Sequence, residues 1–325
     1  MKEKILKCLR EAEDYVSGQE LCQMFDVSRT AIWKVMNQLK EEGYVIDAVK
    51  NKGYRLVQTP DLVTAEEVES LLETSWAARP VVYEEEQAST NQTAKMLAEQ
   101  GASHGTLVVA ERQVSGRGRR GRPWHSPEGS GIWMSILLRP QIHPMSASML
   151  TLVAAMAVYD AISSRVEGCA IKWPNDIVID GRKVCGILTE MSSELDNIHY
   201  VVIGIGINVN TDDFPEDIAS VAASMHVITG AYYKRAEIIA DTWKAFEKYY
   251  DLFVQTENLA LMVDAYNQRL VNMDRRVMIE ERGHRYEGTA RGIDAEGALL
   301  VERNDGTTTS VISGEVSVRG VLGYV

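Results

Sequence analysis

The stretch Gly116-Arg117-Gly118-Arg119-Arg120-Gly121-Arg122 lies between two apolar runs, residues 106–110 and 132–138, that are typical of β-strands. Glycine lets the backbone turn tightly and approach a ligand closely, and arginine offers a rigid fork of donors to phosphate and carboxylate. Taken alone, this composition is equally typical of a disordered basic segment that binds RNA or DNA. A loop held between two core strands is more often a flap over a site. The stretch therefore predicts a sheet with an anion-binding loop above it.

The composition is that of a soluble globular protein with more than one domain. At 325 residues the chain is long for one core, and it is 45% hydrophobic and 25% charged. The net charge of −12 argues against general binding to nucleic acid. Residues 1–60 hold 10 Lys and Arg against 9 Asp and Glu, a balance of +1, and the remaining residues carry −13, which together give −12. Any surface for polyanions is therefore local.

The cysteines and histidines argue against a metal or disulfide framework. Cys8, Cys22, Cys169 and Cys185 lie far apart, and the six histidines form no pair at the spacing of metal ligands. Such usage is typical of a reducing cytosol. The N-terminal residues lack the apolar core of a signal peptide, and no run approaches the roughly 18 to 20 apolar residues that span a bilayer. We therefore expect a cytoplasmic protein with no metal site and no membrane partner.

Residues 1–60 predict a winged helix-turn-helix domain. Apolar residues recur at helical spacing in two short segments, and Ser28 is a suitable N-cap for a third helix, Arg29–Glu42, that ends at Gly43. Two short helices joined by a tight turn form the motif whose second helix enters the DNA major groove. Two strand-like pieces around Lys50-Asn51-Lys52-Gly53 then form the wing.

Polar and basic side chains of this domain are expected to face DNA. The residues assigned to DNA contact are Ser28, Arg29, Thr30, Trp33, Lys34 and Asn37 on the third helix and Lys50 and Lys52 on the wing. The cations among them, with Arg55, would lie where phosphates pass. This arrangement favours DNA over the alternative of a module for protein interaction or dimerisation.

The chain after the linker Gln58-Thr59-Pro60-Asp61 predicts a mixed domain over residues 61–272. Segments typical of strands outnumber those typical of helices, and several are joined by short turns, which predicts an α+β sheet rather than a doubly wound one. Strands are expected at 81–83, 106–110, 132–138, 170–173, 177–179, 184–190 and 200–209, and helices at 91–99, 145–165 and 234–253. Short strands separated by turns over residues 273–325, the last at 314–319, predict a small β-barrel.

Two segments of the central domain carry polar groups at strand ends. Ser89-Thr90-Asn91-Gln92 opens a helix after a strand, so its hydroxyls, amides and backbone N–H groups can bind a small polar ligand. Simple N-capping explains one of these residues equally well. Lys172-Trp173-Pro174-Asn175-Asp176 places a lysine and an aspartate around a proline turn. A salt-bridged corner is the alternative.

Two further segments combine glycine with apolar strands. Gly181-Arg182-Lys183-Val184-Cys185-Gly186 puts two cations at the start of a strand, where Lys183 either points into a cavity or belongs to a solvated hairpin tip. Gly204-Ile205-Gly206-Ile207-Asn208-Val209-Asn210 leaves room for a flat ligand beside the sheet. It lacks the Gly-x-Gly-x-x-Gly spacing of dinucleotide-binding folds, and the sequence has no Walker pattern. A nucleotide would therefore be bound in another way.

These motifs occur in the order and approximate spacing seen in biotin protein ligases, which the chain resembles over nearly its whole length. The resemblance rests on Ser89-Thr90-Asn91, the loop 116–121, residues 172–176, Arg182-Lys183 with Gly186, and Gly204-x-Gly206-x-Asn208. With the winged helix in front, the sequence is similar to the bifunctional biotin ligases and biotin operon repressors of bacteria. The implied fold is α+β and multidomain: a winged helix-turn-helix, a central sheet domain of biotin/lipoate ligase type and an SH3-like C-terminal barrel.

The resemblance implies a reaction in two steps. Biotin and ATP give biotinyl-5′-AMP and pyrophosphate, and a lysine of the biotin carboxyl carrier protein then attacks the mixed anhydride. Cations must offset the repulsion between a carboxylate and a phosphate. The implied catalytic residues are Lys183 against the reacting groups, Arg119 in the loop that closes over the adenylate, and Asp176 beside the incoming lysine.

The resemblance assigns the other site residues to the two ligands. Biotin would be bound by Ser89, Thr90, Asn91, Gln113, Arg117, Gly118, Arg119, Lys183, Gly186, Gly204 and Gly206. ATP and the adenylate would be bound by Gly116, Arg119, Arg120, Trp124, Lys172, Asn175, Asn208 and Arg319, although Trp124 is almost as readily a core residue. Mg²⁺ would accompany ATP, held mostly by phosphate oxygens and water.

The implied partners are the carrier protein, operator DNA of genes for biotin biosynthesis and transport, and a second copy of the chain when biotinyl-AMP is bound. Two rival hypotheses are a lipoate or octanoate ligase of the same superfamily and a regulator that only senses biotin with an inactive ligase domain. The arginine-glycine loop and the winged helix favour biotin over the first. Lys183, Arg119 and Asp176 argue against the second.

Overall fold

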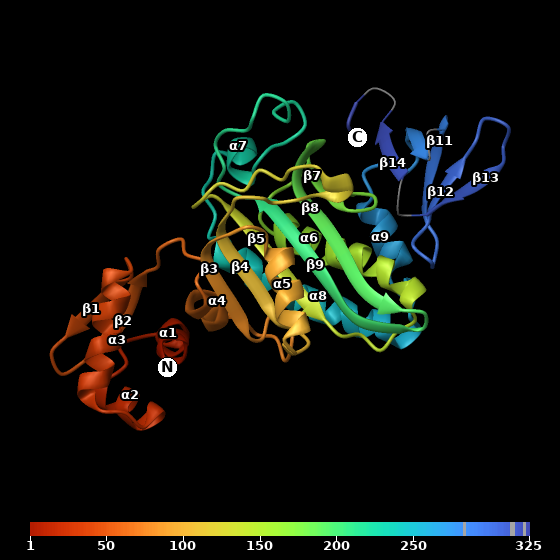
Figure 1. The fold of residues 1–325 in the computed structure, drawn as a ribbon. Helices are drawn as coiled ribbons and strands as arrows, with labels where there is room; N and C mark the ends of the chain where they lie inside the picture. The colour runs from red at the N-terminus through yellow and green to blue at the C-terminus, as the bar shows by residue number, and fades with distance from the viewer. Residues whose placement is uncertain (282–283, 313–315, 321–322) are drawn as a thin grey trace.

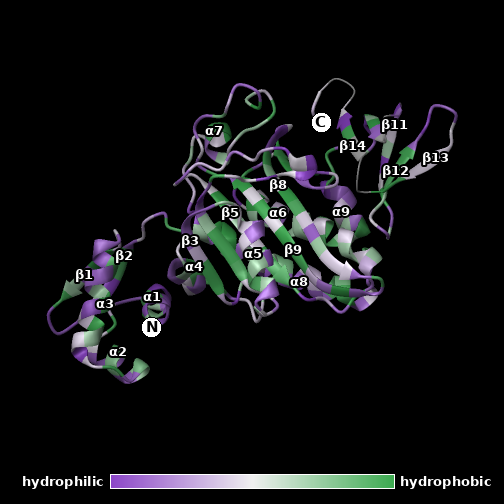
Figure 2. Cartoon of the chain, viewed as in Figure 1, coloured by the Kyte–Doolittle hydropathy of each residue, from purple (hydrophilic) through white to green (hydrophobic). Residues whose placement is uncertain are grey.

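The structure is a computed structural model that describes residues 1–281, 284–312, 316–320 and 323–325. The chain forms a helical N-terminal domain, a central sheet with helices and a C-terminal sheet (Figure 1). This arrangement agrees with the predicted multidomain α+β class. Figure 2 shows hydrophobic residues concentrated along the central strands, whereas α1 to α3 alternate between hydrophobic and hydrophilic residues.

The N-terminal domain has the elements of a winged helix-turn-helix. These are α1 (Lys2–Glu11), α2 (Gly18–Phe25), α3 (Arg29–Glu41), β1 (Val45–Val49) and β2 (Gly53–Gln58). Ser17 and Glu20 form a capping box at the start of α2, and the Ser28 hydroxyl accepts a hydrogen bond from the Ala31 N–H at the start of α3. Strands β1 and β2 pair antiparallel, as expected of a wing.

The central domain is built on one seven-stranded sheet that contains all seven predicted strands. Its order is β3-β4-β5-β9-β8-β7-β6, with β3 and β4 parallel and the other neighbours antiparallel. The strands are β3 (Val81–Gln87), β4 (Leu107–Gln113), β5 (Gly131–Leu138), β6 (Cys169–Lys172), β7 (Asp176–Ile179), β8 (Arg182–Glu194) and β9 (Asn197–Asn208). Strand β5 is apolar on both faces, and every one of its residues is buried.

Helices cover both faces of this sheet. On one side α5 (Thr90–Glu99) packs on β4, β5 and β9, and on the other α6 (Leu150–Ser163) and α8 (Arg235–Thr256) pack together (Figure 1). The alternation of strand residues explains this, because Val108 belongs to the cluster under α5 and its neighbour Leu107 to the main core. The short helices α7 (Met225–Thr229) and α9 (Val263–Arg269) were not predicted.

One helical stretch, Pro144–Ser163, is long and apolar enough by length and composition to cross a membrane. The sequence-based statement that no run approaches this size was wrong by that criterion. The stretch comprises α6 and the 3₁₀ turn before it, and its most apolar window is 72% buried inside the protein. Its side chains fill the main core between the sheet and α8.

The C-terminal domain is a five-stranded antiparallel sheet of order β13-β12-β11-β10-β14. Its strands are β10 (Arg276–Glu281), β11 (His284–Ile293), β12 (Leu299–Glu302), β13 (Thr308–Val311) and β14 (Val316–Gly320). Residues 314 and 315 of the predicted strand 314–319 lie outside the described residues. The domain contacts the turn after β6, because Trp173 Nε1 donates to the Gly297 carbonyl and Lys172 Nζ to the Val318 carbonyl, each at 3.0 Å.

Helix α4 (Ala65–Leu71) joins the winged helix to the central domain and contacts both α1 and α8. Its Glu67 is 3% exposed and pairs with the Arg10 guanidinium. The Tyr44 hydroxyl donates to the same carboxylate at 2.5 Å. Burial first, then the hydrogen bond and charge of Glu67, raise the pKa of Tyr44, so this hydroxyl stays protonated. Both Arg10 and Tyr44 belong to the winged helix, which is thereby fixed on α4.

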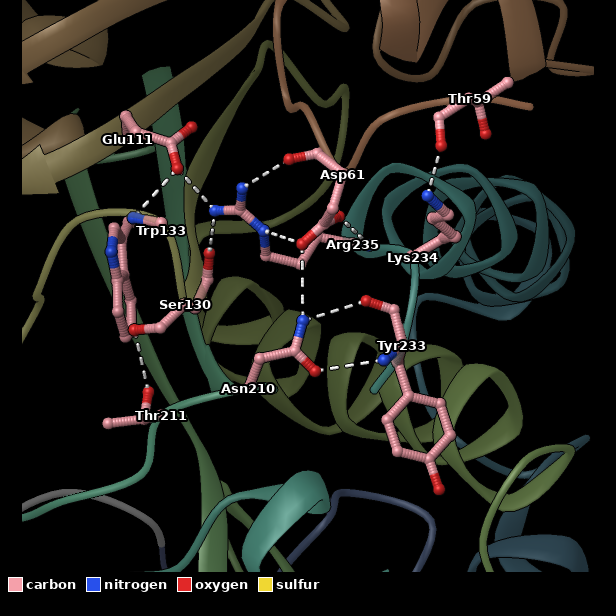
Figure 3. A network of polar contacts seen from close by, with 12 residues as sticks. Thr59, Asp61, Glu111, Ser130, Trp133, Asn210, Thr211, Tyr233, Lys234 and Arg235 are labelled. Atoms are coloured by element: carbon pink, nitrogen blue, oxygen red, sulfur yellow. Dashed lines mark hydrogen bonds and ion pairs between the residues drawn. The ribbon is translucent and has the colours of Figure 1, made fainter. Parts of the chain in front are cut away.

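A second polar network fastens the linker to the central domain (Figure 3). Arg235, at the start of α8, is 2% exposed; its Nε lies 2.9 Å from Asp61 Oδ2 and its Nη1 2.6 Å from Glu111 Oε1. Asn210, just after β9, donates to both Asp61 and the Tyr233 carbonyl. The linker is therefore attached to β4 through Arg235 and Glu111, and to the end of β9 through Asn210. Both strands continue to the cavity described next.

Candidate active site and DNA-binding surface

A cavity of about 370 Å³ lies between the basic loop, the turn after β6 and strands β8 and β9. This volume is within the range of small-molecule sites. All predicted ligand-binding and catalytic residues except Gly116 line it. They are Ser89, Thr90, Asn91, Gln113, Arg117, Gly118, Arg119, Arg120, Trp124, Lys172, Asn175, Asp176, Lys183, Gly186, Gly204, Gly206, Asn208 and Arg319.

The basic loop folds back on itself and reaches across the cavity. The Gly118 N–H donates to the Arg122 carbonyl at 2.8 Å, and Arg119 Nη1 donates to Asn175 Oδ1 at 2.9 Å. Burial lowers the pKa of Arg119 below its usual range, although the guanidinium remains charged at any ordinary pH. Gly116 packs inside the loop, where a Cβ would lie 2.8 Å from both Ser126 Oγ and the Trp124 carbonyl oxygen. Gly116 is not among the cavity-lining residues, and its close contacts explain why a glycine is needed at this point of the turn.

Hydroxyl and amide groups gather at one end of the cavity. Thr90 donates to Gln113 Oε1 from its N–H at 2.9 Å and from its hydroxyl at 3.1 Å, and Ser135 donates to Asn91 Oδ1 at 2.6 Å. Ser89 is the N-cap of α5 but makes no capping hydrogen bond through its side chain within the described residues. The N-capping alternative therefore does not explain Ser89, which lines the cavity.

Glycines form the floor of the cavity. Gly186 and Gly206 are paired across β8 and β9, and the Trp124 indole lies directly on them. A Cβ on Gly206 would be 2.4 Å from Trp124 Nε1, and one on Gly204 would be 2.1 Å from Asn91 Oδ1. The space that these glycines leave beside the strand is taken by the Trp124 indole and the Asn91 amide, and Trp124 lines the cavity rather than belonging to the main core.

Asp176 is the centre of charge in the cavity. Its carboxylate, 7% exposed, lies 2.6 Å from Lys183 Nζ through Oδ1. Burial alone would raise the pKa of Asp176, but the charges of Lys183 and Lys172 outweigh it and lower that pKa below its usual range. Burial lowers the pKa of Lys172 to about 8, against the opposing effect of Asp176. An ionised carboxylate among cations is consistent with both alternatives considered for residues 172–176, a turn that binds a ligand and a salt-bridged corner.

The other end of the cavity was not predicted. It is lined by Phe214, Asp217, Ile218, Val221 and Ala222 and by Tyr324 from beyond β14. Asn208 fixes this loop by donating to the Ala223 carbonyl at 3.1 Å. The loop's cavity-lining side chains are apolar apart from Asp217, and the loop has no glycine or lysine of the kind that marked the other motifs. Its position directly after the Gly204–Asn208 strand was the one feature of the sequence that could have placed it at the cavity.

The predicted DNA-contact residues lie together on the surface of the winged helix. Arg29, Thr30, Trp33 and Lys34 of α3 and Lys50 and Lys52 of the wing are exposed, and Asn37 is half-buried. Ser28 is exposed too, but its hydroxyl caps α3. Lys52 and Arg55 lie over the Tyr15 ring, 5.4 and 4.9 Å from its centroid, so these wing cations pack on the segment between α1 and α2.

The three parts of the chain define a ligase domain of the biotin/lipoate class between a helix-turn-helix domain and a small β domain. Residues 83–208 match the model of the biotin/lipoate A/B protein ligase family, residues 2–55 that of a helix-turn-helix domain, and residues 273–319 that of the biotin protein ligase C-terminal domain. No group of three or more His, Cys, Asp and Glu side chains is arranged to hold a metal ion in the part of the chain that the structure describes.

Relatives agree over almost the full length. The bifunctional ligase/repressor BirA of Bacillus subtilis (strain 168) is 41% identical over 299 residues, covering 90% of this chain and 91% of the relative. BirA of Escherichia coli (strain K12) is 29% identical, covering 97% and 96%. The biotin protein ligase of Aquifex aeolicus in complex with biotin and ATP superposes with a TM-score of 0.66 at 30% identity, covering 74% of this chain and 98% of its own. The chain belongs to the biotin/lipoate protein ligase family, which confirms the sequence-based prediction of a biotin protein ligase joined to a helix-turn-helix domain.

Proposed function

We propose that this chain activates biotin with ATP as biotinyl-5′-AMP, transfers the biotinyl group to a lysine of the biotin carboxyl carrier protein of acetyl-CoA carboxylase, and represses biotin genes in response to biotin. The observation that carries the proposal is the cavity, in which Asp176 lies among Lys183, Lys172 and Arg119 beneath an arginine-glycine loop. Domain bounds of 1–60, 61–272 and 273–325 and a cytoplasmic location belong to the same proposal.

In the first step an oxygen of the biotin carboxylate attacks the α-phosphorus of ATP, and pyrophosphate leaves. Two anions approach each other, so positive charge must be in place beforehand. Lys183 would supply it, because a ligand anion can replace Asp176 as the partner of its ammonium. Arg117 and Arg119, with the loop backbone, would then cover the adenylate and exclude the water that hydrolyses it.

In the second step the acceptor lysine, after its ammonium has lost a proton to solvent, attacks the carbonyl carbon of the mixed anhydride as the free amine. The bond to the phosphate oxygen breaks, AMP leaves with the electron pair, and the nitrogen loses a second proton to solvent as the amide forms. Asp176 would orient the incoming ammonium, since it is the ionised carboxylate beside Lys183. Holding the two reacting groups in place in this way lowers the entropic cost of bringing them together.

Biotin is proposed to lie at the Ser89, Thr90 and Gln113 end, with the Gly204–Gly206 strand and the Trp124 indole that covers it as its wall. The adenylate would occupy the end near Asn208, with Arg319 above it. Mg²⁺ would accompany ATP and be held mainly by phosphate oxygens and water. The cavity residues suit this mode of Mg²⁺ binding. Asp217 lines the proposed nucleotide end, and the other aspartate, Asp176, already has Lys183 and Lys172 as partners.

For repression, the adenylate would order the basic loop, the central domains would form a homodimer, and two winged helices would engage a two-fold symmetric operator through α3 and the wing. The exposed cations Arg29, Lys34, Lys50 and Lys52 support this surface. The ligand of catalysis would then also signal that biotin is plentiful.

Exchange of labelled pyrophosphate into ATP tests the ligase proposal. Exchange should depend on biotin, and biotin should then appear on the carrier protein. Exchange with lipoate or octanoate instead would favour the rival ligase, and tight biotin binding without exchange would favour a regulator with an inactive ligase domain.

DNA binding is tested with Arg29→Ala and Lys34→Ala together. Operator affinity should fall at least tenfold while ligation is unchanged, since phosphate contacts dominate affinity. Lys4→Ala with Lys7→Ala is the matched control, because it removes the same charge from α1, the helix that faces α4. Equal losses for both variants, or loss of ligation, would contradict the assignment. Sedimentation with and without biotinyl-AMP tests the homodimer, and unchanged association would count against it.

A further inference from the structure

The C-terminal domain contributes a tyrosine to the cavity that no motif predicted. Tyr324 lies beyond β14 and lines the cavity with Arg319. Its hydroxyl donates a hydrogen bond to Asp176 Oδ2, and its ring lies under Lys172, with Nζ 4.1 Å from the ring centroid. One side chain thus contacts both charged residues of the turn 172–176.

The hydroxyl of Tyr324 is a donor under all ordinary conditions. Burial, followed by the Asp176 charge and the hydrogen bond, raises the pKa of Tyr324 well above its usual range. Asp176 is ionised, so the bond is a neutral donor to a charged acceptor, which is stronger than one between neutral groups. The two carboxylate oxygens are divided between partners, with Oδ1 beside Lys183 at 2.6 Å and Oδ2 bound to Tyr324.

We propose that Tyr324 is a positioning residue of the ligase site: its hydroxyl fixes the Asp176 carboxylate, and Asp176 in turn sets where the Lys183 ammonium stands before the two anions arrive. The inference rests on the proposed ligase function and names a residue that function does not require. Lys183 Nζ also lies 5.2 Å from the Trp124 ring centroid, so its ammonium contacts both the Trp124 ring and the Asp176 carboxylate. Loss of the hydroxyl would leave Asp176 free to turn about its side-chain torsion, and Lys183 would follow.

A merely structural role for this hydroxyl is a distinct hypothesis. The C-terminal domain is already attached to the same turn by Lys172 Nζ to the Val318 carbonyl and by Trp173 Nε1 to the Gly297 carbonyl. Neither contact involves the hydroxyl, and a phenylalanine would keep the ring under Lys172. Tyr324→Phe therefore removes one hydrogen bond and leaves the domain contact in place.

Tyr286→Phe is the matched control. Tyr286 lies in β11 of the same domain, and Arg303 lies over its ring at 4.1 Å, the same separation as Lys172 over Tyr324. Its buried hydroxyl has no hydrogen-bond partner among the residues that the structure describes. The two variants thus make the same chemical change, one with and one without a bond to the site.

The experiment measures biotin-dependent exchange of pyrophosphate into ATP and transfer to the carrier protein, with thermal unfolding in parallel. For Tyr324→Phe we expect kcat of exchange to fall about tenfold with KM for biotin unchanged, and the thermal midpoint to fall by a few degrees because a buried hydrogen bond to a charged group is lost. Tyr286→Phe should match the wild type. Wild-type kinetics for Tyr324→Phe, or a loss confined to KM or to thermal stability, would overturn the inference. Absence of exchange in the wild type would instead refute the proposed function.

Discussion

Arg235→Met should lower the free energy of unfolding of the central domain by about 3 kcal/mol, near the lower end of the range for breaking one side of a buried ion pair. The substitution removes the guanidinium that binds Glu111 at 2.6 Å and Asp61 at 2.9 Å. The Glu111 side chain is 12% exposed and that of Asp61 28%, so most of the cost comes from the charge stranded on Glu111. Glu111 still accepts from the Gly129 N–H at 2.9 Å, which limits the loss.

Urea unfolding followed by tryptophan fluorescence and by circular dichroism measures this loss, and two probes are needed because the chain has several domains. Glu111→Gln in the Arg235→Met background removes the stranded charge. The double variant should therefore lose about 2 kcal/mol less than the sum of the two single variants. Arg165→Met is the control: Arg165 pairs with Asp241 at 2.6 Å, but that aspartate is 49% exposed, so the loss should be about 1 kcal/mol or less.

Additive losses for the Arg235 and Glu111 variants would refute this reasoning, as would a loss for Arg235→Met no larger than that of the Arg165 control. Either result would mean that water reaches the pair and screens it. The linker would then be held by its other contacts, such as those of Asn210 with Asp61 and of Lys234 with the Thr59 carbonyl.

Three further predictions concern the cavity. Arg119→Gly removes the hydrogen bond to Asn175 and should release free biotinyl-AMP into solution, detected by chromatography of the filtrate, while operator binding by the winged helix is kept. Gly206→Ala puts a Cβ 2.4 Å from Trp124 Nε1, so the indole must move by about 1 Å and KM for biotin should rise at least tenfold in the exchange assay. Lys172, with a pKa of about 8, should gain a proton when phosphate binds beside it, so ATP affinity measured by calorimetry should fall about tenfold from pH 7 to pH 9. Lys172→Met should abolish that pH dependence, and an unchanged affinity in the wild type would show that phosphate does not reach it.

The parts of the fold that the sequence predicts are those with local causes. Ser28 caps a helix through its own neighbours, and the strands of the central sheet are recognisable because apolar residues fill both faces of segments between turns. The cavity residues were predicted for another reason. Each motif alone allowed an ordinary structural explanation, and the five motifs in order along the chain carried the resemblance that assigned them.

Contacts between distant segments left no such trace. Arg235 and Asp61 are 174 positions apart, and each resembles an ordinary surface charge in the sequence. Tyr324 is 148 positions from Asp176 and follows no motif. The stretch Pro144–Ser163 is a second example of information that the sequence lacks. Its apolar composition alone would suit a membrane span, and only the tertiary structure shows that most of it is covered by protein.

An aspartate inside an anion-binding cavity has a physical reason. Without Asp176, the cations Lys172, Lys183 and Arg119 would share a poorly solvated space with no carboxylate at the centre of the cavity to offset their repulsion. The pKa of Lys172 is already lowered to about 8 with Asp176 present, so loss of that carboxylate would move it further toward neutrality at physiological pH. Asp176 thus keeps the site positively charged before the ligands arrive, and its pairing with Lys183 is the contact that a biotin carboxylate or a phosphate has to replace.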